Sequence, residues 1–201
     1  MKYTVIKKAI DKDLALFLFN YFLIKKQVYV TCLKERYISP YEELLGTNGD
    51  GQMPNTYSCY SDIAMETLML KCQPKMEKIT GLKLYPAYSY ARIYKKGDEL
   101  KRHKDRFSCE WSTTMNLGGD SWPIYLEPSG ETGKKGIKID LKPGDMLIYK
   151  GCELEHWRKK FKGKECAQVF LHYNDSKTQK AKNNMFDTRP HVGLPSWFKK
   201  K

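Results

Sequence analysis

The spacing of apolar positions changes near residue 84, and the change predicts two kinds of structure along the chain. Residues 11–34 are rich in apolar side chains and are predicted to form a helix with Asp11 as its N-cap. Residues 61–79 place apolar side chains close to helical spacing, and Gly81 is predicted to end that helix. The first part of the chain is therefore mainly helical.

Beyond this point the pattern becomes one of short β segments separated by turns, and residues 2–10 add a predicted edge strand. Regularly spaced short strands are typical of a sandwich or barrel. Helices that precede such strands can cover one of the sheets. We therefore predict an α+β, mainly β fold: a double-stranded β-helix, or jelly roll, with N-terminal helices buttressing one sheet. The expected strands are 84–94, 109–116, 124–127, 137–141, 146–149, 155–158 and 166–173.

The length of 201 residues fits a single domain with a substantial core. We expect an N-terminal strand and helices over 1–83, the jelly-roll core over 84–175, and a basic tail over 176–201. Residues 46–60 are rich in Gly, Asn and Pro, and we predict a mobile loop there of the kind that serves as a lid.

The longest apolar run, residues 14–24, contains Asn20 and is too short to span a bilayer. No small-residue cleavage site follows it, so we predict a buried helix in a cytoplasmic protein without a membrane partner. The six cysteines form no CxxC pair, which favours reduced, mostly buried thiols.

A formal net charge of +13 brings nucleic acid into consideration as a partner. The excess is spread out, however, and is densest in residues 95–106, in 158–164 and at the end of the tail. Solvated lysine usually explains such runs. Nucleic acid is therefore the less favoured partner.

Candidate chemistry centres on the triplet His103-Lys104-Asp105 and on His156. On a strand, residues two apart point to the same face, so His103 and Asp105 can reach one metal ion. A His and an Asp at this spacing also occur on ordinary solvated strands, and the triplet alone is weak support. However, the chain has only four histidines, and two of them fall where a 2-His-1-carboxylate site needs them. This ligand set binds Fe(II) and leaves positions open for O₂ and a chelating co-substrate.

Three segments between residues 84 and 174 carry a recognisable pattern. They are Tyr94-x-x-Gly97-x-x-Leu100-x-x-His103-x-Asp105, Pro143-Gly144-Asp145 followed by an apolar strand and His156, and Lys164-x-x-x-x-Val169-Phe170-Leu171-His172. Together they resemble the 2-oxoglutarate/Fe(II)-dependent dioxygenases, and within them the prolyl 4-hydroxylase-like branch. Leu100 departs from the pattern of this branch, since many prolyl hydroxylases carry Tyr there.

The resemblance implies an oxidoreductase with Fe(II) as cofactor and 2-oxoglutarate and O₂ as co-substrates. Such an enzyme hydroxylates a C–H bond and releases succinate and CO₂. The branch implies prolyl residues of a peptide or protein as the substrate, and it adds ascorbate as a candidate cofactor.

The resemblance also suggests Lys164 and Tyr94 as residues for the co-substrate. Thr114, on the strand after the iron triplet, could donate to the same carboxylate as Lys164, because Ser112 and Thr114 would face inwards together. A dicarboxylate buried in a barrel needs a fixed cation, because an unpaired buried charge is costly. Alternation along the closing strand would place Lys164 on the inner face. Arg92, Arg106 and Arg158 remain competitors for this role.

We expect the substrate to contact His172, Trp157 and Arg158, since the branch contacts its peptide at matching positions. Two other functions stay open: a nucleic-acid-modifying 2-oxoglutarate oxygenase and a non-catalytic jelly-roll binding module. A cupin-type metal enzyme that works without 2-oxoglutarate is a further alternative, but its usual HxH pairing is absent from the sequence.

Overall fold

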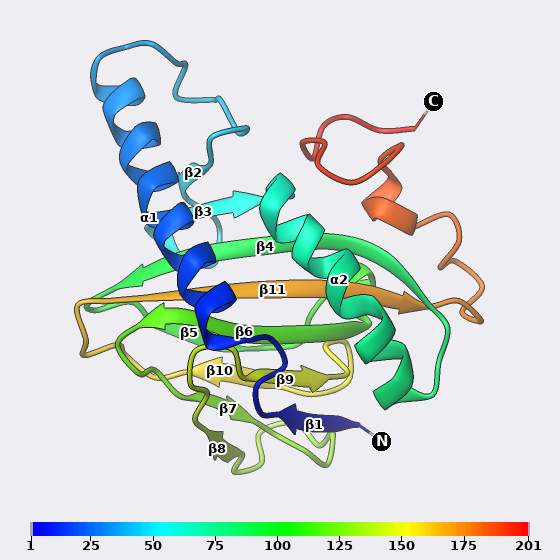
Figure 1. Ribbon diagram of the computed structural model, residues 1–201. Helices are drawn as coiled ribbons and strands as arrows, with labels where there is room; N and C mark the ends of the chain where they lie inside the picture. Colours follow the sequence, from blue (N-terminus) through cyan, green and yellow to red (C-terminus); the bar gives the residue numbers. More distant parts are fainter. Residues whose placement is uncertain (1, 201) are drawn as a thin grey trace.

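The computed structural model describes residues 2–200, which form two antiparallel β-sheets and two α-helices (Figure 1). The strands are β1 (Tyr3–Ile6), β2 (Thr47–Gly49), β3 (Pro54–Tyr60), β4 (Leu84–Lys95), β5 (Leu100–His103), β6 (Trp111–Gly119), β7 (Ile124–Leu126), β8 (Ile137–Ile139), β9 (Met146–Tyr149), β10 (His156–Arg158) and β11 (Glu165–Asp175). The larger sheet has the order β1-β9-β6-β11-β4-β3-β2, and the smaller has the order β5-β10-β7-β8. Short 3₁₀ segments lie at Phe107–Cys109 and Met185–Thr188.

From β4 onward the chain passes back and forth between the two sheets. This winding is the double-stranded β-helix, so the predicted fold class is confirmed. β1 pairs with β9 at the edge of the larger sheet, as the sequence pattern predicts for the N-terminal strand. The sequence pattern did not reveal β5, the strand that carries His103.

The helices α1 (Lys12–Lys34) and α2 (Ile63–Thr80) cover one face of the larger sheet (Figure 1). The sheet packs tightly against α1 at Gly118 of β6, where an added Cβ would lie 2.7 Å from the ring of Phe19. Gly81 ends α2 in the left-handed conformation, with φ of 72°. Among the described residues, no helix is both long and apolar enough to cross a membrane.

The prediction of a long mobile loop over residues 46–60 is wrong. β2 and β3 form a hairpin there, and β3 adds to the sheet by pairing with β4. The buried ring of Tyr57 packs against Phe22 and Tyr29 of α1, with ring centroids 5.2 and 5.4 Å apart. The Gly and Asn residues therefore mark only the turn between β2 and β3. The segment after the turn forms a strand because Tyr57 packs into the core against α1.

The central strands β4 and β11 pair along their whole length and direct alternate side chains towards the smaller sheet. This register sets Tyr94 opposite Cys166, Arg92 opposite Gln168, and Tyr88 opposite His172. Polar and aromatic side chains of β4 and β11 thus line the inside of the barrel.

Candidate metal centre

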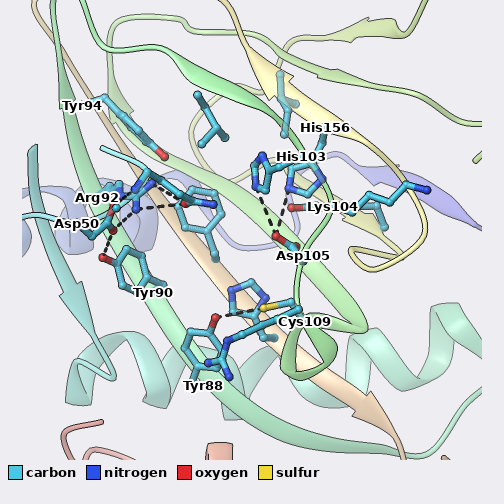
Figure 2. Close-up of a pocket in the computed structure, with 18 residues that line it drawn as sticks. Asp50, Tyr88, Tyr90, Arg92, Tyr94, His103, Lys104, Asp105, Cys109 and His156 are labelled. Carbon is cyan, nitrogen blue, oxygen red and sulfur yellow. Dashed lines mark hydrogen bonds and ion pairs between the residues drawn. The ribbon is translucent and has the colours of Figure 1, made fainter. Parts of the chain in front are cut away.

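The predicted iron ligands meet at one end of the smaller sheet. His103 is the last residue of β5, His156 is the first of β10, and the two are paired across the strands. Asp105 lies just beyond β5, and its Oδ1 is 3.5 Å from the Nε2 atom of each histidine. Figure 2 shows the three side chains pointing towards one another. Their candidate ligand atoms all lie within 4.8 Å of one another, as a shared metal ion requires.

Backbone carbonyls fix the orientation of both imidazole rings. His103 Nδ1 lies 2.7 Å from the carbonyl oxygen of Lys101, and His156 Nδ1 lies 3.1 Å from that of Leu154. An Nδ1–H that donates to a carbonyl leaves the lone pair on Nε2, the atom that faces Asp105. The donor set therefore fits a divalent metal bound through two Nε2 atoms and one carboxylate oxygen.

The charges of the cluster suit a carboxylate that stays ionised. Burial raises the pKa of Asp105, but the charge of His156 and hydrogen bonding with both histidines outweigh it and hold that pKa well below its usual range. Burial lowers the pKa of His103, yet hydrogen bonding with Asp105 and with the Lys101 carbonyl raises it overall. An ionised Asp105 is the form that binds a cation.

A cavity of about 390 Å³ opens beside this cluster. Its wall on β4 carries Tyr88, Tyr90, Arg92 and Tyr94, and Figure 2 shows Arg92 and Tyr94 across the cavity from the cluster. Asp50 reaches the cavity from the turn after β2, where its carboxylate pairs with Arg92 and accepts a hydrogen bond of 2.6 Å from the Tyr90 hydroxyl. The turn after β2 thus forms part of the rim.

Arg158 is buried inside the barrel, with 1% of its surface exposed. Its guanidinium donates to the carbonyl of Trp122, to Thr114 Oγ1 at 3.1 Å and to Gln168 Oε1 at 3.2 Å. Among residues 2–200 no carboxylate forms an ion pair with it, and burial lowers its pKa. Thr114 faces inwards as predicted and contacts this cation.

Three donor atoms near this point have no partner within the described part of the chain. They are Arg158 Nε, Arg92 Nε and the hydroxyl of Tyr94, all buried. The ring of Tyr94 packs on Trp122 at a centroid distance of 4.7 Å, while Arg158 Cζ lies 5.1 Å from Trp122 and Arg92 Cζ lies 5.9 Å from Tyr94. Arg92, Tyr94, Trp122 and Arg158 therefore follow one another through ring contacts inside the barrel, with Arg92 and Tyr94 at the cavity wall.

The structure corrects the position predicted for Lys164. This lysine is exposed and precedes β11, and its backbone N–H donates to the carboxylate of Asp120 at 2.6 Å. Alternation within β11 does place Cys166 and Gln168 on the inner face, but the strand starts after Lys164. Lys164 is therefore not a cation of the barrel interior.

The three residues predicted to contact the substrate, His172, Trp157 and Arg158, lie in different places in the structure. Arg158 lies deep inside the barrel, whereas Trp157 points outwards from the same strand, with the Arg102 guanidinium 3.6 Å from its ring centroid. His172 lines the cavity but is buried, and its Nδ1 lies 3.0 Å from Ser112 Oγ. Burial lowers the pKa of His172 to about 4, so it is neutral at physiological pH. Of the three, only His172 borders the cavity.

The sequence analysis kept Arg158 only as a competitor of Lys164 for the co-substrate cation. Spacing favours its inward position, because His156 and Arg158 are two apart on one strand and must share the inner face. The sequence analysis missed the contact between Ser112 and Asp105, which joins β6 to the segment after β5. No local pattern marks that contact.

Comparison with known proteins rests on structure alone. No family model matches the sequence, and no curated protein matches it. Three of the similar solved structures are a 2OG-Fe(II) oxygenase family oxidoreductase from Burkholderia pseudomallei (13% identity, TM-score 0.51, 60% of this chain and 68% of that one), a prolyl-4-hydroxylase from Pseudomonas putida (14%, 0.54, 87% and 92%), and HygX from Streptomyces hygroscopicus with nickel and 2-oxoglutarate bound (11%, 0.58, 88% and 84%). The chain therefore has the jelly-roll fold seen in 2-oxoglutarate/Fe(II) oxygenases.

Proposed function

We propose that the protein is a 2-oxoglutarate- and Fe(II)-dependent dioxygenase that hydroxylates a C–H bond. One observation carries the proposal: a His, Asp and His cluster shares its barrel with three buried donors that have no partner in the described chain. The cluster fits the metal, and the donors fit the far carboxylate of a chelating dicarboxylate. The chemistry needs both parts, because the co-substrate chelates the metal at one end and must be held by its far carboxylate at the other.

His103, Asp105 and His156 would hold the iron through two imidazole nitrogens and one carboxylate oxygen. When bound, Fe(II) activates O₂ for hydroxylation while 2-oxoglutarate is converted to succinate and CO₂. The carbonyls of Lys101 and Leu154 orient the two histidines through the Nδ1 contacts, and the cavity beside the cluster gives the reacting groups room.

Arg158 is the residue we assign to the distal carboxylate of 2-oxoglutarate. A buried guanidinium without an anion is unfavourable by several kcal/mol, roughly, and a bound carboxylate would remove that penalty. Its free Nε–H and the free hydroxyl of Tyr94 supply hydrogen-bond donors, and Thr114 and Gln168 hold the guanidinium in place. Arg92 is the second cation of this wall, but it already pairs with Asp50.

This assignment departs from what the family resemblance implies. The resemblance places the cation at Lys164 on the closing strand, whereas Arg158 comes from β10, two residues after His156. Position 168 of the closing strand faces inwards with a neutral glutamine, which accepts from Arg158 at 3.2 Å. In this proposal the cation comes from β10 of the smaller sheet, the strand that precedes β11 along the chain, and not from the closing strand itself.

For the substrate we propose prolyl residues of a peptide or protein. The support is the family resemblance, the likeness to the prolyl-4-hydroxylase from Pseudomonas putida, and the aromatic lining of the cavity by Tyr88, Tyr90 and Phe170. Proline-rich segments are commonly recognised in grooves lined by aromatic side chains.

An anaerobic absorption titration with Fe(II) and 2-oxoglutarate tests the proposal. We expect a visible charge-transfer band that needs both components and is lost in His156→Ala. No band from the folded protein would overturn the proposal and favour a non-catalytic jelly-roll module. For the substrate, Pro-containing peptides should increase succinate formation and gain one oxygen atom; a response to oligonucleotides alone would contradict the prolyl assignment.

A further inference from the structure

The second oxygen of the Asp105 carboxylate is enclosed by the chain. Oδ1 faces the two histidines, whereas Oδ2 accepts a hydrogen bond of 3.0 Å from Ser112 Oγ. Ser112 is fully buried on β6, and its hydroxyl also lies 2.9 Å from the carbonyl oxygen of Cys109. The two carboxylate oxygens therefore have different surroundings.

His172 completes this arrangement from β11. Its Nδ1 lies 3.0 Å from Ser112 Oγ, and the hydroxyl has only one proton to give. Two acceptors, Asp105 Oδ2 and the Cys109 carbonyl, already compete for that proton. His172 must therefore donate from Nδ1 to the lone pair of Ser112, which keeps the hydroxyl proton directed at those acceptors.

Gly151 closes the same side of the carboxylate. An added Cβ at this position would lie 2.4 Å from Asp105 Oδ2, 2.4 Å from the Cys109 carbonyl oxygen and 2.7 Å from Ser112 Oγ. The carbonyl of Gly151 also accepts a hydrogen bond of 2.9 Å from the backbone N–H of Asp105. Only glycine fits at position 151, and it leaves Asp105 Oδ2 just enough space for the hydrogen bond from Ser112.

We propose that Ser112, oriented by His172, is a positioning residue that makes Asp105 bind the metal through one oxygen only. The proposal rests on the proposed iron site. With one carboxylate oxygen and two imidazoles, three of six positions stay open for a two-atom chelate and O₂. A carboxylate that turned and bound through both oxygens would fill a fourth position and leave too few. Ser112 thus preserves the open face of the site.

Co(II) titration of the purified protein tests this, since Co(II) replaces Fe(II) without oxidising and its visible bands change with the ligands around it. We expect Ser112→Ala to bind Co(II) about 10- to 100-fold more weakly, the usual effect of losing an outer-shell partner, with bands that differ from those of wild type. The matched control is Thr113→Ala, which removes a neighbouring buried hydroxyl that accepts from the Leu171 N–H and does not touch Asp105. This control should match wild type.

His172 supplies a pair of variants that separates positioning from packing. His172→Asn keeps a donor close to the Nδ1 position and should retain the affinity and the spectrum, whereas His172→Leu should behave like Ser112→Ala. Ser112→Ala with wild-type affinity and bands would overturn the proposal, provided that wild type binds Co(II). Wild type that binds no Co(II) would overturn the metal centre itself. Should Ser112→Ala not fold, the two His172 variants decide: equal spectra would refute the role of Ser112.

Discussion

Replacing Arg158 by methionine should weaken 2-oxoglutarate binding by at least about 100-fold. The substitution removes the only buried guanidinium of the described chain that has neither an acidic partner nor a full set of hydrogen bonds, while it keeps an unbranched side chain in the barrel. If the co-substrate supplies the missing anion, the loss appears in its affinity. Iron binding should not change.

The magnitude follows from the burial of Arg158. Removing one partner of a buried ion pair typically weakens it by about 3 to 5 kcal/mol. A difference of about 1.4 kcal/mol is tenfold in affinity, so even the lower figure gives about 100-fold. A surface cation would give far less, since exposed pairs contribute about 1 kcal/mol or below.

The ligand-free protein should respond in the opposite sense. Arg158→Met gives up donor contacts with Trp122, Thr114 and Gln168, each contributing about 0.5 to 1.5 kcal/mol. It also relieves an uncompensated buried charge whose penalty is of similar or larger size. We therefore expect the free energy of unfolding without co-substrate to stay level or rise.

The assay is an anaerobic titration of the Fe(II)-loaded protein with 2-oxoglutarate, followed by the charge-transfer band, alongside urea unfolding without ligand. Lys164→Met is the control, because Lys164 is the cation that the family resemblance favours and it lies exposed outside β11. We expect wild-type affinity from this control. Unchanged affinity in Arg158→Met, or a large loss in Lys164→Met, would refute the reasoning.

Three further predictions concern other parts of the barrel. His103→Ala or Asp105→Ala should abolish tight Fe(II) binding, measured by equilibrium dialysis, with little change in circular dichroism; iron retained at wild-type affinity would contradict the ligand assignment. Burial lowers the pKa of His172 from 6.5 to about 4, so the unfolded chain takes up its proton at a higher pH than the folded chain does. The free energy of unfolding of the metal-free protein should therefore fall by about 3 kcal/mol as the pH drops from 6.5 to about 4. His172→Asn should lack this pH-dependent loss when urea unfolding is measured across the pH range. The same pH dependence in wild type and His172→Asn would contradict the prediction. Asp50→Asn removes the ion pair with Arg92 and should speed amide exchange in the turn after β2 by up to about tenfold, whereas unchanged exchange would mean that the pair does not hold the turn.

Local patterns were enough to predict most of the elements. Apolar periodicity located both helices and seven strands of the jelly roll, because it reflects which face of each element is buried. The prediction of a mobile loop over residues 46–60 was wrong because it also rested on local composition. Gly and Asn indicate a turn, whereas the pairing of β3 with β4 depends on a strand that is distant in sequence. Such pairing leaves no trace in the stretch itself.

The sequence by itself determined the ligand types and their spacing, His103 and Asp105 two apart and His156 far along the chain. Only the tertiary structure decided how they meet, because β5 and β10 pair across that separation. It also decided which cation lies inside. Lys164 and Arg158 are both candidates by alternation, but alternation holds only within a strand, and β11 begins one residue after Lys164. Where a strand begins depends on its neighbours' hydrogen bonds, which the order of residues alone does not reveal.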